Sequence, residues 1–206
     1  LALGDPEEET IYAILKNVGL FRSRDDGAWW ERIFIETGHE NKVSVDPNNP
    51  EHIYIAKPGV SGDKAGLYKS ENGGDTWTIL PEPLPGTDIN YFYAFINPHD
   101  STLYGALFVQ PGDLTISVCG LFRFDEINQS WIRLEEEDLL DQSTPVSAVG
   151  FSPTIPETMY AALVGGRILE SLDGGESWSL HSESPLDYIR ELVVNPVGGE
   201  LWICGP

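Results

Sequence analysis

The chain has 206 residues, 33 of them Asp or Glu and 12 of them Lys or Arg, which gives a formal net charge of −21. A field of that sign repels phosphate backbones, so nucleic acid is not expected as a ligand. No apolar run of about 18 residues occurs, so the sequence predicts no helix that spans a membrane.

Short apolar strands separated by turn residues recur along the chain at intervals of roughly 40 to 50 residues, the length of a four-stranded unit. The uninterrupted repeat predicts one architecture over residues 1–206. In chain order, the predicted units cover residues 1–38, 39–87, 88–143 and 144–186, and residues 187–206 supply two further strands. In the second unit, we expect strands near residues 42–46, 52–57, 66–70 and 77–80.

One segment of each unit repeats most clearly. It reads S-R-D-D-G-A-W-W at residues 23–30, S-E-N-G-G-D-T-W at 70–77, S-L-D-G-G-E-S-W at 171–178 and, in eroded form, F-D-E-I-N-Q-S-W at 124–131. An Asx side chain at the third position can bond the backbone of its own turn, and glycine accepts a positive φ. The Trp that follows can fold over the turn. Each segment is therefore predicted to form a tight hairpin.

This pattern resembles the Asp-box, also called the BNR repeat, which reads S-x-D-x-G-x-T-W. The resemblance implies an all-β fold, a β-propeller of four-stranded antiparallel blades, with the motif between the third and fourth strands and away from the usual ligand face. The residues assigned to the motif are Ser23, Asp25, Trp30, Ser70, Asn72, Gly74, Trp77, Trp131, Ser171, Asp173, Gly175 and Trp178.

A second repeat lies in phase with the first. An Asx-Pro or Ser-Pro turn precedes a strand whose second residue is aromatic, as in V-D-P-N-N-P before I-Y-I-A at residues 45–56. Proline cannot continue a central ladder, so each turn ends one strand before the next begins. The turn resembles the join between the first and second strands in sortilin-like and xyloglucanase-like propellers, a superfamily that also includes photosystem II assembly factors.

The repeats add up to about four and a half blades, whereas a ring closes on a whole number. We therefore expect the chain to be a piece of a larger propeller. Alternatively, a second chain completes the ring, because unpaired blade edges favour association.

Ligands of propellers usually bind on the face where the channel opens, and first strands line that channel. Residues at the start of two first strands are therefore the candidate ligand-binding residues: Asn90, Tyr91, Tyr93, Tyr188 and Arg190.

Two carboxylates occupy equivalent places before first strands, Asp88 in D-I-N-Y and Asp187 in D-Y-I-R. Most glycosidases use two carboxyl groups that flank the scissile bond, and neighbouring aromatic rings can stack on sugars. The alternative is that each Asp caps its loop or is solvated. The catalytic motifs of xyloglucanases do not map onto any stretch of this chain, so the pair is a hypothesis from position alone.

No metal or cofactor site is predicted. The acidic run at residues 135–138 lacks the ligand spacing of a Ca²⁺ loop and is interpreted as a solvated loop. Cys119 and Cys204 are expected to be buried free thiols because they lie in blades that are not neighbours.

Three hypotheses for function follow. The first is a non-catalytic binding or scaffold propeller that recognises a protein or peptide, with a cationic partner favoured by the charge. The second is a glycoside hydrolase resembling xyloglucanases, with carbohydrate as ligand. The third is a purely structural part of a larger assembly. The acidity is compatible with an extracellular or periplasmic setting.

Overall fold

The computed structural model describes residues 2–3, 10–15, 18–35, 42–57, 66–84, 91–109, 118–134 and 144–205. All regular elements in these ranges are strands, which form four four-stranded sheets and one two-stranded sheet. No helix long and apolar enough to cross a membrane occurs in this part of the chain. The all-β prediction is confirmed.

The sheets are called blades 1 to 5, and in each one the strands pair antiparallel in chain order. Blade 1 contains β1 (Ala2–Leu3), β2 (Ile11–Leu15), β3 (Gly19–Ser23) and β4 (Glu31–Ile35). Blade 2 contains β5 (Val43–Asp46), β6 (Asn49–Lys57), β7 (Gly66–Ser70) and β8 (Thr78–Ile79). Blade 3 contains β9 (Tyr91–Ile96), β10 (Leu103–Val109), β11 (Val118–Asp125) and β12 (Ser130–Leu134). Blade 4 contains β13 (Val146–Phe151), β14 (Met159–Leu163), β15 (Arg167–Ser171) and β16 (Ser179–Glu183), and blade 5 contains β17 (Glu191–Val194) and β18 (Leu201–Cys204).

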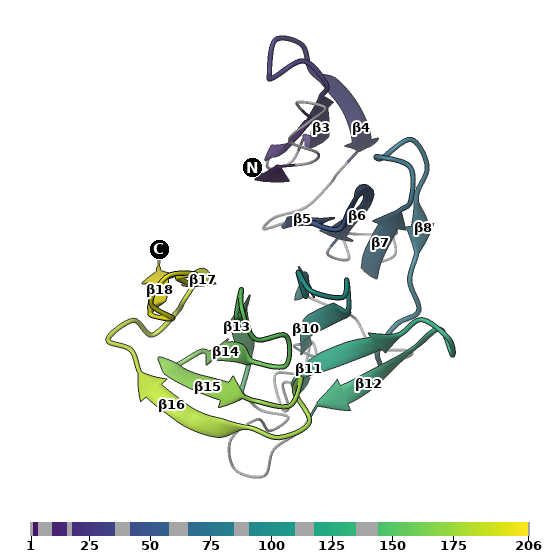
Figure 1. The fold of residues 1–206 in the computed structure, drawn as a ribbon. Coiled ribbons are helices and arrows are strands. Elements are labelled where there is room, and N and C mark those ends of the chain that lie inside the picture. The colour runs from purple at the N-terminus through teal and green to yellow at the C-terminus, as the bar shows by residue number, and fades with distance from the viewer. Residues whose placement is uncertain are drawn as a thin grey trace.

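The blades follow one another around an arc, from the N-terminal sheet to β17 and β18 (Figure 1). First strands of neighbouring blades contact each other, as β5 does with β9 and β13 with β17, so they lie on the inner side of the arc. Antiparallel order then fixes the two ends of each blade. The turns from second to third strand share one end with the connections to the next blade, and the third-to-fourth hairpins lie at the other end.

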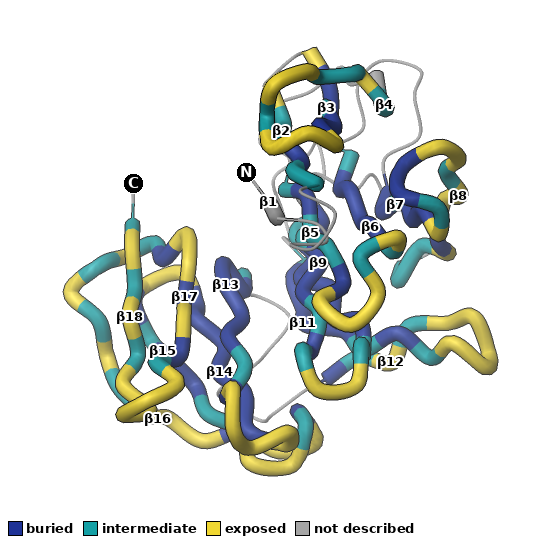
Figure 2. Tube along the Cα trace, turned by 45° about the horizontal axis from the view of Figure 1, so that its top comes forward, coloured by how far each residue is buried: buried dark blue, intermediate teal, exposed yellow. Residues whose placement is uncertain are grey.

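The core consists of apolar layers between successive blades rather than one central cluster. Leu20 of blade 1 packs with Ile53 and Ile55 of blade 2, and corresponding layers join the later blades. Buried residues concentrate in the inner strands, whereas the outer strands and the tips of the hairpins are largely exposed (Figure 2). Each blade therefore gains most of its stability from burial against its neighbours.

The Asx-Pro turns form a second connection between blades. Asp46 is buried, and its Oδ1 accepts hydrogen bonds from the Asn48 N–H at 2.9 Å and from the Ser101 hydroxyl of the next blade at 2.8 Å. In the following blade, the His99 ring Nε2 lies 2.8 Å from the Ser152 carbonyl oxygen. The short turns predicted from proline thus also join one blade to the next.

The expectation of two buried thiols is correct for Cys119 and wrong for Cys204. Both cysteines are free, but Cys204 is exposed. It ends β18, where Leu201 and Ile203 pack against blade 4 and the alternate residues point away from it.

A pair of glycines shapes the turn between β14 and β15. Gly165 and Gly166 both have positive φ, +96° and +88°. The Gly165 N–H donates to the Asp187 carbonyl at 2.7 Å, and the Ser184 N–H donates to the Gly166 carbonyl at 2.8 Å. This turn therefore holds the segment that leads into β17.

We predict that Gly166→Ala destabilises the chain more than Gly165→Ala. Both substitutions place an L-residue at positive φ, which costs about 1–2 kcal/mol. A Cβ on Gly166 would lie 2.6 Å from the Ser184 carbonyl oxygen, whereas one on Gly165 meets nothing within 4 Å. We expect an additional loss of about 1–3 kcal/mol for Gly166→Ala, measured by urea unfolding. Equal losses would mean that the close backbone approach does not constrain this turn.

Candidate functional site

The residues that precede β17 form the best-described part of the predicted ligand face. Asp187 and Arg190 are exposed, Tyr188 is half-exposed, and Ile189 between them is fully buried. The Arg190 N–H donates to the Cys204 carbonyl at 2.8 Å, so the segment is fixed at both ends through its backbone. Asp187, Tyr188 and Arg190 are called the rim below.

The other candidate residues are placed differently. Asp88 and Asn90 lie outside the described residues, and so does the side chain of Tyr91 in β9. Tyr93 is half-buried and packs against the apolar layer between blades 3 and 4. The structure thus brings Asp187, Tyr188 and Arg190 together and places Tyr93 in a packing role. The acidic run at residues 135–138 also lies outside the described part of the chain.

A lysine missed by the sequence analysis lies next to the rim. The Lys42 Nζ, just before β5, is 3.4 Å from the Glu191 Oε1 at the start of β17 and 5.0 Å from the centre of the Phe95 ring in β9. Blades 2, 3 and 5 therefore meet at one charged contact on the inner side of the arc. Both charged residues are next to first strands, but nothing in their local sequence indicates that they pair.

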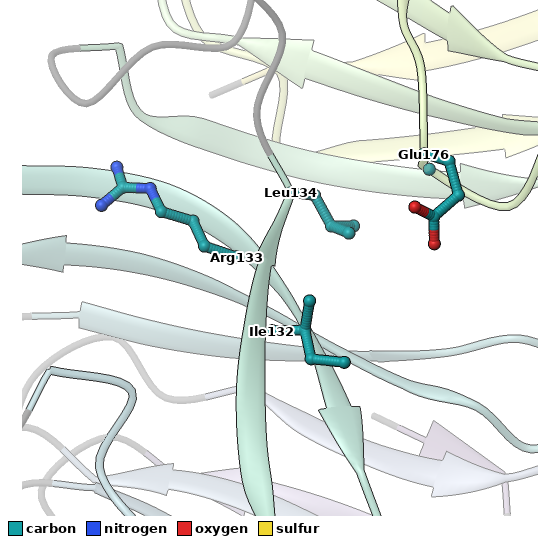
Figure 3. A pocket seen from close by; sticks show the side chains of 5 residues that line it. Ile132, Arg133, Leu134 and Glu176 are labelled. Carbon is teal, nitrogen blue, oxygen red and sulfur yellow. The ribbon is translucent and has the colours of Figure 1, made fainter.

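An open recess of about 470 Å³ lies where β12 meets the hairpin of blade 4. Its lining includes Ile132, Leu134 and Glu176, and the side chain of Arg133 points away from these three (Figure 3). The Arg133 guanidinium donates to the Cys119 carbonyl and lies over the Phe122 ring. The Glu176 carboxylate is already paired with Arg123, so we interpret the recess as a gap at the boundary between blades 3 and 4 and not as a ligand site.

The four repeated segments, residues 23–30, 70–77, 124–131 and 171–178, are called Trp-hairpins. In the last of them, the Ser171 hydroxyl accepts from the Gly175 N–H at 2.8 Å and donates to the Asp173 Oδ1 at 2.8 Å. The same Oδ1 accepts from the Ser177 N–H at 2.9 Å, and the Trp178 Nε1 donates to the Gly175 carbonyl at 3.1 Å. These bonds close the turn within eight residues.

The same bonds recur in two other Trp-hairpins. Ser23 accepts from the Gly27 N–H and donates to Asp25, which accepts from the Trp29 N–H. The hairpin at residues 70–77 repeats these bonds with Ser70, Asn72, Gly74 and Thr76. The indole N–H groups of Trp30 and Trp77 donate to the carbonyls of Gly27 and Gly74. The eroded copy uses another turn, in which Asp125 accepts the backbone N–H groups of Ile127 and Asn128. Its Trp131 Nε1 donates instead to the Pro81 carbonyl of the preceding blade at 2.8 Å.

The Trp-hairpins of blades 2 to 4 are held by contacts with the preceding blade. In each four-stranded blade, a tyrosine of the second strand lies directly opposite a charged residue of the third strand, and the pairs are Tyr12 with Arg22, Tyr54 with Lys69, Tyr104 with Arg123, and Tyr160 with Glu170. Burial raises the pKa of all four tyrosines to about 12, so their hydroxyls remain neutral donors. These residue pairs are called clamps.

The first clamp holds the second Trp-hairpin. Arg22 is 4% exposed, and its guanidinium donates to the Gly73 carbonyl at 2.5 Å, to the Asp75 carboxylate at 2.8 Å and to Glu31 of its own blade at 2.6 Å. The Tyr12 hydroxyl donates to the same Gly73 carbonyl at 3.4 Å. The clamp therefore binds the fourth and sixth positions of the next hairpin.

The later clamps repeat this arrangement. The Tyr104 hydroxyl donates to the Gly174 carbonyl at 3.1 Å, and Arg123 lies 2.7 Å from the Glu176 carboxylate. These acceptors are again the fourth and sixth positions of a Trp-hairpin. The middle clamp differs in detail, since Lys69 lies 3.4 Å from Glu126, the third residue of the eroded hairpin of blade 3, and 2.9 Å from Glu71 of its own blade. Three consecutive boundaries thus use one basic side chain of a third strand to hold the hairpin that follows.

No family model matches the chain. The sequence is 23% identical to the oligoxyloglucan-reducing end-specific xyloglucanase of Emericella nidulans, over 97% of this chain. It is 22% identical to a probable enzyme of the same description from Neosartorya fischeri, over 99% of this chain. The chain spans about a quarter of the length of these curated relatives, 26% in each case.

Solved structures support the fold. The GH74 xyloglucanase from Xanthomonas campestris matches 97% of this chain and 34% of its own, with a TM-score of 0.73 and 18% identity. The GH74 enzyme of Niastella koreensis matches with a TM-score of 0.70 and 16% identity, over 96% of this chain and 34% of its own. YCF48 bound to a D1 peptide matches with a TM-score of 0.56 and 16% identity, over 95% of this chain and 56% of its own. The β-propeller fold is therefore confirmed.

We predict that Arg22→Gln destabilises the chain by roughly 2–3 kcal/mol, because it leaves the Gly73 carbonyl buried without its charged donor. Arg24→Gln is the matched control, since Arg24 is exposed and lies 3.9 Å from the same Asp75. Its expected effect is below about 0.5 kcal/mol. Urea unfolding of both variants measures the difference, and similar losses would contradict a specific role for the clamp.

A second prediction concerns acid stability. Hydrogen bonds from the Ser177 side chain and backbone, together with one from Ser171, lower the pKa of Asp173. A lowered folded-state pKa contributes stability that is present above the unfolded pKa of about 3.9 and is lost as the pH falls through the folded value. The stability difference between the natural chain and Asp173→Asn should therefore shrink as the pH is lowered from 6 to about 3.

The natural Asn72 provides the reciprocal variant. Its Oδ1 already accepts from the Ser70 hydroxyl and the Thr76 N–H, at the place where the last hairpin has a carboxylate. Asn72→Asp should therefore add a contribution to the free energy of unfolding that is lost at low pH, as the contribution of Asp173 is. Urea midpoints measured across this pH range test both changes, and pH-independent differences would show that neither carboxylate stabilises its turn.

Proposed function

We propose that this chain is part of a glycan-binding β-propeller, with the rim of Asp187, Tyr188 and Arg190 in contact with the sugar. The observation that carries the proposal is the rim itself: a half-exposed tyrosine between an exposed carboxylate and an exposed guanidinium, fixed by backbone hydrogen bonds. Aromatic faces pack on the apolar faces of sugar rings, and charged groups bond their hydroxyls. A rigid segment presents both without a large loss of entropy on binding.

The sequence relatives favour carbohydrate over other ligands. Both are described as xyloglucanases, and each aligns with nearly all of this chain. The Trp-hairpins are consistent with this assignment, since their Ser, Asx, Gly and Trp residues make the bonds expected of Asp-boxes. We therefore assign them as structural Asp-boxes at the end of the blades opposite the rim.

Hydrolysis is a further step of the proposal. Two carboxyl groups about 5–10 Å apart would be needed, and Asp187 with Asp88 is the pair predicted from the sequence. Asp187→Asn preserves the size and hydrogen bonding of the side chain. If this carboxylate is catalytic, the variant should bind glycan within about threefold of the natural chain but lose hydrolysis by at least about 100-fold.

The binding test uses a β-1,4-linked glucan oligosaccharide carrying xylose branches, titrated by calorimetry. Tyr188→Ala should weaken binding about tenfold, because it removes the stacking surface. Trp29→Ala is the matched control, since Trp29 is 63% exposed but lies in a Trp-hairpin at the other end of the blades. Equal effects of the two variants, or no binding by the natural chain, would refute the glycan proposal.

A cationic peptide is the second candidate ligand, favoured by the net charge of −21. A lysine-rich peptide titrated against the same variants separates the two candidates, because its binding should weaken strongly as salt is raised. Binding of this peptide with no binding of glycan would favour the peptide-recognition hypothesis. Failure of both ligands would favour the purely structural hypothesis.

A further inference from the structure

The clamp of blade 4 differs in charge from the other three. Blades 1 to 3 have Arg22, Lys69 and Arg123 at the third-strand position of the clamp, whereas blade 4 has Glu170. The backbone register is the same in all four, with each charged residue opposite its tyrosine. Glu170 therefore occupies the position at which the other three blades have a basic residue that contacts an acidic residue of the next hairpin.

The local contacts of Glu170 leave room for a partner. Its Oε1 accepts from the Tyr160 hydroxyl at 2.9 Å, and its Oε2 lies 3.8 Å from the His181 Nδ1. In blades 1 and 3, by contrast, the tyrosine hydroxyl donates to a carbonyl of the next blade. The Glu170 side chain is 25% exposed, so its carboxylate is accessible.

The two strands of blade 5 show where a hairpin would attach. In the described residues β18 pairs with β17 alone, whereas the second strand of every other blade also pairs with a third. In blade 5, Leu201 lies opposite Val194, the last residue of the first strand. Ile53 and Met159 lie opposite Val45 and Phe151 in the same way, so Leu201 is equivalent to them in strand register. Gly199 is then equivalent in register to Glu51, Ser101 and Glu157.

That equivalence supplies a second contact point. The N–H of the fourth hairpin residue donates to the Glu51 carbonyl in blade 2, through Gly73 at 3.0 Å, and to the Glu157 carbonyl in blade 4, through Gly174 at 2.8 Å. A hairpin added to β18 in the same register would meet the Gly199 carbonyl. Its sixth residue would then face Glu170.

We infer that the surface of Tyr160 and Glu170, with the edge of β18, binds a β-hairpin that has Lys or Arg at its sixth position. The charge is set by complementarity: where the clamp residue is an arginine the sixth residue is Asp75 or Glu176, so an acidic clamp favours a cation. A wrong charge would place two carboxylates together in a partly buried site, which is unfavourable. This inference does not depend on the glycan proposal.

The test uses two cyclised hairpin peptides copied from residues 167–183, because an isolated hairpin is marginally stable in water. One peptide retains Glu at the position of Glu176, and the other has Lys there. Fluorescence anisotropy measures their binding to the chain. The Lys peptide should bind at least about tenfold more tightly than the Glu peptide, and the preference should diminish as salt is raised.

The variant Glu170→Arg should reverse this preference, because it recreates the basic clamp of the other blades. Glu183→Arg is the matched control, since it makes the same change in net charge at an exposed position of β16 and should leave the preference unchanged. Circular dichroism and the urea midpoint establish that each variant is folded.

Reversal in Glu170→Arg together with an unchanged preference in Glu183→Arg supports the inference. Equal binding of both peptides, a reversal in both variants, or no binding of either peptide at millimolar concentration overturns it. A glycan titration of Glu170→Arg is independent of these outcomes, because the rim lies at the other end of the blades.

Discussion

The structure depends on the way each blade holds the hairpin of the next one. A sheet of four strands cannot bury both of its faces alone, so its stability comes from the apolar layers between blades. Apolar contacts in those layers carry little directional preference of their own. The clamps add direction: a buried guanidinium that binds a backbone carbonyl and a carboxylate together accepts one position of the neighbouring hairpin.

The Trp-hairpins suit these contacts because hydrogen bonds of their own close each turn. Serine and Asx side chains satisfy the turn's own N–H groups, so the carbonyl of the fourth residue is left for the preceding blade. Glycine at the fifth position also lets the blades approach closely. A Cβ on Gly74 would lie 2.3 Å from the Ile33 Cδ1, and one on Gly175 would lie 2.9 Å from the Leu134 Cδ1. The same residues close the turn and fit it to its neighbour.

The two ends of the blades consequently have different roles. One end is devoted to contacts between blades, through the Trp-hairpins and the Asx-Pro turns, which leaves it little freedom to vary. The other end carries the rim, in which Asp187 and Arg190 are exposed and Tyr188 is half-exposed, on a segment that backbone hydrogen bonds hold in place.

The sequence by itself determined the all-β fold, the repeat and the closed hairpins. Those features follow from bonds between residues at most eight positions apart, such as Ser171 with Asp173 and Gly175, so a local pattern is sufficient to predict them. The sequence placed Tyr188 and Arg190 at the start of a first strand, whereas in the structure they precede β17, which begins at Glu191.

Only the tertiary structure decided which residues meet across blades. Arg22 binds a carbonyl 51 residues away, and Lys42 meets Glu191 through the curvature of the arc. No local pattern encodes such partners, because their distance depends on how each sheet twists and packs against the next. The exposure of Cys204 was also decided by packing between blades. Alternation along β18 predicts two faces of the strand, but the sequence does not show which face blade 4 covers.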